Sequence, residues 1–273
     1  MSELVGVFAT AHTPVMINLA DNASENVRND VFAAYRDVGR RITESEPDVL
    51  VVISDDHLHN FFLDNFPAFC IGVAAQYSGP IEAWLKTDQA TVIGDPELGA
   101  HLLFEVMERG FDPSFTMQFT LDHGYVVPLE LAGIRGRHRI VPIHVNTVQP
   151  PMPSMGRCLA FGQALGAAIR SWSADVRVAV LATGGISHDV GTPRMGMLNE
   201  EFDREFLRRL AWGDTDSLVA YAAANVDKAG NGAEEVRSWL IAHGIAGGSF
   251  STLYYQGVAE WYTGIALGEW EIQ

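Results

Sequence analysis

The chain has 273 residues, and its 18 Lys and Arg against 34 Asp and Glu give a formal net charge of −16. This excess of acid excludes a nucleic-acid-binding protein, because phosphate backbones are held by clustered cations. Hydrophobic residues make up 48% of the chain, which is enough for a sizeable core. No apolar run reaches the roughly 18 residues that a membrane-spanning helix needs, so we expect no membrane span.

The N-terminus has no basic region followed by an apolar stretch, so we expect no secretion signal. Cys70 and Cys158 stand in apolar surroundings and form no CxxC pair. We therefore expect two core thiols in a cytoplasmic protein, because the cytoplasm keeps thiols reduced.

Strand and helix patterns alternate along the chain. An apolar strand at 4–8 precedes a helical pattern at 25–44, for which Ser24 is the expected N-cap. The later elements are strands at 49–53, 140–145 and 176–182, and helices from Asp95 to Arg109, at 155–171, and near 199–211, 215–225 and 233–243. This alternation predicts an α/β fold: a single domain over residues 1–273, with a central mixed sheet flanked by helices.

Three of these strands end in segments that carry histidine. His12 follows the first strand, Asp55-Asp56-His57 follow the strand at 49–53, and His188 follows the strand at 176–182. Open α/β sheets bind their ligands at the carboxyl ends of strands. The pattern therefore favours a metal or acid/base site over core packing.

The chain has nine histidines, and we expect them to fall into two groups. His101, His138 and His243 have the surroundings of surface or capping residues, and His144 lies inside a strand as a hydrogen-bonded core residue would. The other five lie where a strand pattern breaks, beside small, polar or proline residues: His12, His57, His59, His123 and His188.

A histidine metal site usually includes a carboxylate, as in the triad of two histidines and one carboxylate that binds non-haem Fe(II). The acids nearest to these histidines could be ligands or could orient the imidazoles as hydrogen-bond partners. They are Asp55, Asp56, Asp122 and Asp189.

Glu235 is a further candidate ligand from the late helix. It shares a helix face with Trp239 and Ala242, and it is expected to point inward, where an unpaired charge is costly. Glu234 lies on the face of Arg237, and we expect these two residues to form a solvated pair.

Other catalytic motifs are missing. Gly185-Ile186-Ser187-His188-Asp189 lacks the closing glycine of a G-x-S-x-G nucleophile elbow. The chain has no HExxH, P-loop or dinucleotide fingerprint, so a nucleotide enzyme is disfavoured. A Zn(II)-dependent hydrolase that uses His12, His57 and Glu235 remains an alternative, because nitrogen and oxygen ligands do not by themselves select iron over zinc.

Four short motifs occur in the order found in class III extradiol ring-cleaving dioxygenases: Ala11-His12-Thr13-Pro14, Asp55-Asp56-His57, Asp122-His123-Gly124 and Thr183-Gly184-Gly185-Ile186-Ser187-His188. Within that family the chain resembles the β (catalytic) subunit of protocatechuate 4,5-dioxygenase, from the first strand to about residue 245. The resemblance implies a substrate that is an aromatic vicinal diol, of the catechol, aminophenol or dihydroxypyridine type. Both atoms of O2 would be inserted with meta ring cleavage.

The resemblance also implies roles for single residues. His12, His57 and Glu235 would bind Fe(II), and His188 would be the acid/base residue. His123 would contact the substrate or oxygen, and Thr13 would lie at the substrate. His59 has no counterpart, and we expect it to support a neighbour.

The chain departs from protocatechuate enzymes in two ways. It has no extension that could replace their small helical α-subunit, so we expect a homo-oligomer or a separate small α-type subunit. Ala259-Glu260 stands where those enzymes place a hydroxylic residue that helps to hold the substrate carboxylate. We therefore expect Glu260 near the substrate and a preference for diols without a carboxylate.

Overall fold

Four parallel strands form the centre of the sheet because each is an apolar run that packs on both faces. They are β1 (Glu3–Thr10), β2 (Val49–Ser54), β7 (Arg139–Val145) and β8 (Arg177–Thr183). Their spatial order is β7-β2-β8-β1, and every neighbouring pair is parallel. All residues of β2 are buried, as expected of a strand that is covered on both faces.

The computed structural model describes residues 1–273 and completes the sheet with four more strands. β3 (Phe69–Gly72) is antiparallel to β7 and parallel to β6 (Ser114–Thr116), and β10 (Thr263–Ile272) is antiparallel to β1 and to β9 (Gly247–Val258). The full order is β6-β3-β7-β2-β8-β1-β10-β9, and β4 (Gln76–Gly79) and β5 (Ala90–Ile93) form a separate ribbon. The expected α/β fold with a central mixed sheet is confirmed.

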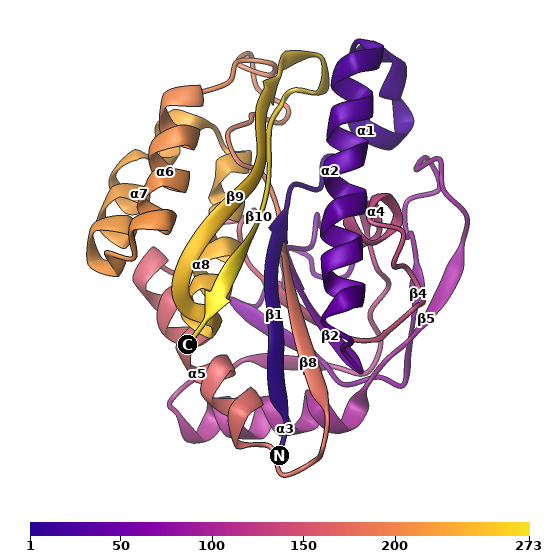
Figure 1. The fold of residues 1–273 in the computed structure, drawn as a ribbon, viewed down its shortest axis with the longest axis vertical. Coiled ribbons are helices and arrows are strands. Elements are labelled where there is room, and N and C mark those ends of the chain that lie inside the picture. Colours follow the sequence, from indigo (N-terminus) through magenta and orange to yellow (C-terminus); the bar gives the residue numbers. More distant parts are fainter.

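Helices cover both faces of the sheet (Figure 1). One face carries α3 (Pro96–Glu108), α5 (Met155–Ser171), α6 (Glu200–Trp212), α7 (Thr215–Ala229) and α8 (Val236–Ala246), and the other carries α2 (Glu25–Glu44) and α4 (His123–Leu131). Alternate residues of β2 serve the two cores: Val51 and Ile53 pack with the first group, Leu50 and Val52 with the second. The short elements are α1 (Val15–Asn18) and 3₁₀ turns at Ala20–Asn22, Gly232–Glu235 and Ala259–Trp261. None of the helices has the length and apolar character needed to span a bilayer.

Most expected elements agree with the structure. Ser24 caps α2 by accepting a hydrogen bond from the Val27 N–H at 3.4 Å, and α5 has the bounds expected from its pattern. Gly110 follows α3 with a φ of +80°, a backbone conformation that glycine adopts without strain. The sequence patterns did not predict α4 or the β9–β10 hairpin. This hairpin extends the sheet beyond β1, and the loop at its tip leads to the site described below.

Candidate metal centre

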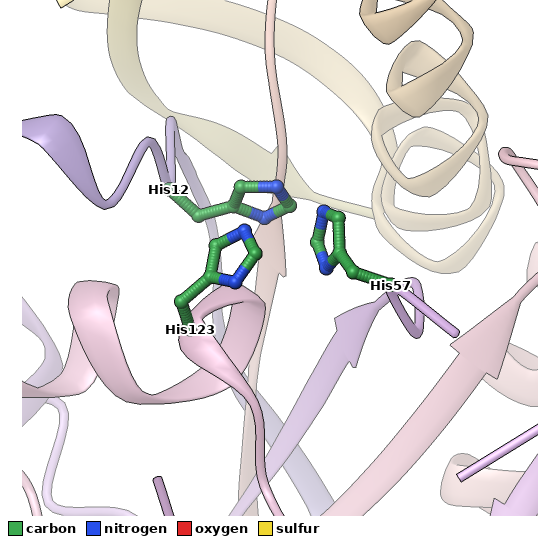
Figure 2. A group of neighbouring side chains, drawn as sticks. All are labelled: His12, His57 and His123. Atoms are coloured by element: carbon green, nitrogen blue, oxygen red, sulfur yellow. The ribbon is translucent and has the colours of Figure 1, made fainter. Parts of the chain in front are cut away.

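Two histidines and one glutamate converge at the carboxyl ends of the parallel strands. His12 follows β1, His57 follows β2, and Glu235 ends the 3₁₀ turn that leads into α8. Nε2 of His12 lies 3.3 Å from Oε2 of Glu235, and Nε2 of His57 lies 3.8 Å from Oε1 of the same carboxylate. Figure 2 shows the rings of His12 and His57 turned toward each other, with His123 from the start of α4 beside them.

Each of the two imidazoles is oriented through its other nitrogen. Nδ1 of His12 lies 3.2 Å from Oγ1 of Thr183, and Nδ1 of His57 lies 2.8 Å from Oδ2 of Asp122. Both Nε2 atoms are thereby turned toward Glu235. Nε2 of His12 is buried and makes no hydrogen bond. An unpartnered buried nitrogen beside a second imidazole and a carboxylate fits a divalent metal ion with nitrogen and oxygen ligands.

Glu235 is held by the glycine pair at the end of β8. The side chain of Glu235 is 5% exposed, as expected of an inward residue, although it lies in a 3₁₀ turn and not within the helix itself. The N–H of Gly185 donates to its carboxylate. Gly184 has a φ of +130°, and a Cβ there would lie 2.8 Å from Cβ of Glu235. Burial opposes ionisation, but His12 and His188 outweigh it and hold the pKa of Glu235 well below its usual range.

The prediction that Glu234 and Arg237 form a solvated pair was wrong in one respect. The two residues do form an ion pair, but they are only 8% and 7% exposed. Nε of Arg237 also donates to the backbone oxygen of Pro153 at 2.7 Å. The segment before α5 thus contacts Arg237, and local helix periodicity could not show this contact.

His123 and His59 share one buried acceptor. Nδ1 of His123 lies 2.6 Å from Oε1 of Glu82, the N–H of His123 donates to the same oxygen at 3.0 Å, and Nε2 of His59 lies 3.2 Å from it. Glu82 is 3% exposed, and no motif marked it in the sequence. His59 was expected to support a neighbour, and the neighbour that it contacts is Glu82. Burial and the neighbouring His57 lower the pKa of His123.

The side-chain geometry allows three overlapping ligand sets. They consist of His12, His57 and His123; of His12, Asp55, His57 and Glu235; and of Glu82, Asp122 and His123. Oδ2 of Asp55 accepts a hydrogen bond from Oγ1 of Thr147 at 2.7 Å, and it lies 3.5 Å from Nε2 of His57.

His188 is a third histidine beside the carboxylate of Glu235. Its Nδ1 lies 3.2 Å from the backbone oxygen of Ile186, and its Nε2 lies 3.4 Å from Oε1 of Glu235. A Cβ on Gly232 would lie 2.0 Å from this Nε2, so only glycine fits beside the ring. Burial opposes protonation of His188, but the charge of Glu235 outweighs it and raises the pKa of the ring.

A buried aspartate holds the loop that carries His188. The backbone N–H of Ser187 donates to Oδ1 of Asp203 at 2.9 Å, and Oδ2 accepts from the hydroxyls of Ser187 at 2.7 Å and Tyr255 at 2.9 Å. Burial raises the pKa of Asp203 to about 6. The strand β9 and the helix α6 are therefore tied to the site through this carboxyl group.

The remaining acids shape the surrounding loops. Asp56 accepts hydrogen bonds from the backbone N–H groups of His59, Asn60 and Phe61 and so folds the loop after β2. Asp189 pairs with Arg194, with Nη2 and Oδ2 3.0 Å apart. Together with Asp122, these residues act as supports for their neighbours.

Two histidines outside the site test the earlier expectations. His144 is a buried strand residue whose Nε2 lies 3.3 Å from the backbone oxygen of Pro67, which confirms the prediction of a hydrogen-bonded core histidine. His243 is 4% exposed, and its Nδ1 accepts from Nε1 of Trp270 at 3.1 Å. Of the expected surface or capping roles, the surface position was wrong for His243, because Trp270 of the unpredicted strand β10 packs against it.

A cavity of about 400 Å³ opens onto the converging side chains. Thr13 lines it, whereas Glu260 is exposed and is not one of its lining residues; Tyr262 and Thr263 from the same segment are. Its other lining residues include the five site histidines, Glu235, Asp189, Trp84, Val190 and Met195.

The chain is similar to known proteins along most of its length. Residues 6–266 match the family described as the catalytic LigB subunit of aromatic ring-opening dioxygenase. The chain is 30% identical to the 2,3-dihydroxyphenylpropionate/2,3-dihydroxicinnamic acid 1,2-dioxygenase of Paraburkholderia xenovorans, over 92% of each chain. It is 28% identical to the enzyme of the same name from Rhodococcus globerulus, over 94% of this chain and 95% of that one. The fold is similar to that of an uncharacterized Escherichia coli K12 protein, with a TM-score of 0.65 and 14% identity. The match covers 98% of this chain and 100% of that one.

Proposed function

Because the chain belongs to the family of catalytic LigB subunits of aromatic ring-opening dioxygenases, and is thus an extradiol ring-cleaving dioxygenase, we propose that His12, His57 and Glu235 hold Fe(II). The observation that carries the proposal is the position of the two Nε2 atoms, both turned toward the buried carboxylate of Glu235. A buried glutamate needs a cation, and a metal ion held between these three side chains would supply one. Similarity to named dioxygenases gives no support to the alternative of a hydrolase that uses the same residues.

When bound, ferrous iron supplies open positions for the two diol oxygens and O2, together with the electron transfer that joins them. Zn(II) has no redox chemistry and would not supply this. The protein orients the proposed ligands by hydrogen bonds: Thr183 and Asp122 hold the two imidazoles, and the N–H of Gly185 holds the carboxylate.

His188 is the proposed acid/base residue. Its Nδ1 is held at the oxygen of Ile186, which leaves Nε2 to take the proton of a diol hydroxyl and to return it later in the reaction. Nδ1–H of His123 donates to Glu82, and the pKa of the ring is lowered, so its Nε2 is free to accept a hydrogen bond from the substrate. Thr13 lines the cavity beside His12 and contributes to its wall.

The named relatives act on 2,3-dihydroxyphenylpropionate, which is a catechol with a side chain on the ring. We propose a substituted catechol as the substrate of this chain as well. The test is anaerobic loading of the protein with Fe(II) or with Zn(II), followed by addition of catechol in oxygenated buffer. We expect uptake of one O2 per catechol and a ring-opened product with Fe(II) only. Equal product from the Zn(II)-loaded protein, or no oxygen uptake with Fe(II), would contradict the proposal.

Besides the diol and O2, we propose a second copy of the chain as a partner. Phe62 and Leu63, in the loop after β2, are 56% and 69% exposed and offer apolar surface for such a contact. A homo-oligomer is expected in light scattering of the purified chain. A monomer that binds a small α-type subunit would contradict this and favour the other assembly expected from the resemblance.

We also propose the cytoplasm as the compartment. Cys70 and Cys158 are both buried and free, and burial raises the pKa of each thiol to about 12. A protein with two inert thiols and no disulfide fits a reducing compartment. Cell fractionation tests this directly, and recovery of the protein outside the cytoplasm would contradict it.

A further inference from the structure

The cavity contains no fixed cation for a substrate carboxylate. None of its lining residues is Lys or Arg, although two of them, Asp189 and Glu235, are acids. Arg194 contacts a lining residue, but its guanidinium is paired with Asp189 at 3.0 Å, and Arg194 itself lines a different cavity. Bidentate pairing with arginine is a common way to bind a carboxylate, and this arginine is already engaged.

The histidines of the cavity do not replace this cation. Nε2 of His59 lies 3.2 Å from the buried carboxylate of Glu82, and this acid also holds His123. One positive charge on these two rings is therefore balanced by Glu82. His12, His57 and His188 are all directed at the carboxylate of Glu235, and the first two are assigned to the metal. The net charge of −16 adds a repulsive field for anions that approach the cavity.

The outer wall of the cavity is apolar instead. Trp84, Val190 and Met195 line it and are 52%, 60% and 48% exposed, so they have surface left to bury against a ligand. Each methylene group buried there would strengthen binding about fourfold, since its transfer is worth about 0.8 kcal/mol. A carboxylate on the same chain would lose its water and gain no charged partner.

We infer that the substrate is a catechol whose ring substituent is uncharged and apolar, and that Trp84, Val190 and Met195 select it. This deepens the proposed function and rests on it. The substrate class differs from that in the names of the relatives, whose 2,3-dihydroxyphenylpropionate carries a carboxylate. It agrees with the preference expected from the sequence, but the selecting residues belong to the cavity wall, and Glu260 lies outside it.

The experiment compares three substrates on the Fe(II)-loaded protein: catechol, 2,3-dihydroxyphenylpropionate and the methyl ester of that acid. The acid and the ester share the ring and the chain and differ in charge, so their ratio of kcat/KM isolates the carboxylate. We expect the ester to exceed the acid by about tenfold or more. In Met195→Lys the new cation should raise kcat/KM for the acid at least about fivefold and so lower the ratio of ester to acid.

Met107→Lys is the matched control. Met107 is 51% exposed on α3, outside the cavity, and the variant adds the same charge to the protein. It should leave the ratio of ester to acid unchanged. A wild-type enzyme with a higher kcat/KM for the acid than for the ester would overturn the inference. The proposed function would still stand in that case if the enzyme consumes O2 with catechol. Failure of all three diols to consume O2 overturns both.

Discussion

Glu234 and Glu235 are neighbours in sequence and are both buried, yet we expect their removal to have opposite consequences. Glu235→Ala removes the carboxylate that faces Nε2 of His12 and of His57, so the protein should lose iron. Glu234→Ala should keep iron, because its carboxylate is turned to Arg237. The two variants delete the same side chain, and each is therefore the control for the other.

The cost of Glu234→Ala lies in stability. The side chain of Arg237 is 9% exposed, and without Glu234 its charge stays buried and unpaired. Loss of one partner of a buried pair costs about 3–5 kcal/mol. Nε of Arg237 still donates to Pro153 and Nη1 to the backbone oxygen at 234, so we expect the lower end, about 3 kcal/mol.

The assay combines iron content after anaerobic loading with urea unfolding of each variant. We expect wild-type iron and a lower unfolding midpoint for Glu234→Ala. Glu235→Ala should be folded, without iron. Glu235→Gln, which keeps the shape of the side chain, should also lose iron. A folded Glu234→Ala protein that has lost its iron, or a Glu235→Ala protein that keeps it, would refute the reasoning.

Three further predictions concern residues around the metal. His188→Phe should keep iron and diol binding but lower kcat on the order of 10²-fold or more, as for loss of a positioned acid/base group; loss of iron would make His188 a ligand. Glu82→Ala should keep iron but lower turnover on the order of 10–100-fold, because the ring of His123 loses its acceptor, and Glu82→Gln should restore part of the rate; unchanged kinetics would show that Glu82 is dispensable. The pKa of Asp203 is raised from 3.8 to about 6, so the folded protein binds this proton more tightly than the unfolded chain does. The protonated carboxyl therefore stabilises the fold below pH 4, and this stabilisation is lost as the pH rises to 6. The unfolding free energy of the wild type, relative to Asp203→Asn, should fall by about 3 kcal/mol across this window, and a rise would contradict it.

The sequence predicts the centre of the fold well because its strands are apolar runs bounded by clear helix caps. β2 and α5 illustrate this: one is buried throughout, and the other begins after the N-cap Ser154. The β9–β10 hairpin escaped prediction because its pairing with β1 is non-local, and its burial pattern along β9 does not alternate. The burial of His243 was not predicted for the same reason, since its partner Trp270 lies in β10.

Most residues of the candidate site could be located from the sequence because each follows a strand. His12, His57 and His188 are brought together by the parallel order of β1, β2 and β8. Glu82 could not be found, since it lies in a loop without periodicity and its role depends on contact with His123 across 41 positions of sequence. The exposure of Glu260 depends in the same way on how the tip of the hairpin folds.

The third metal ligand beside His12 and His57 is proposed to be Glu235, but His123 is also close enough to take that place. The direct measurement is the iron content of His57→Ala and His123→Ala after identical anaerobic loading. We predict that His57→Ala binds no iron and that His123→Ala binds as much as the wild type while its turnover falls. Loss of iron from a folded His123→Ala protein would contradict the assignment of Glu235 as the third ligand.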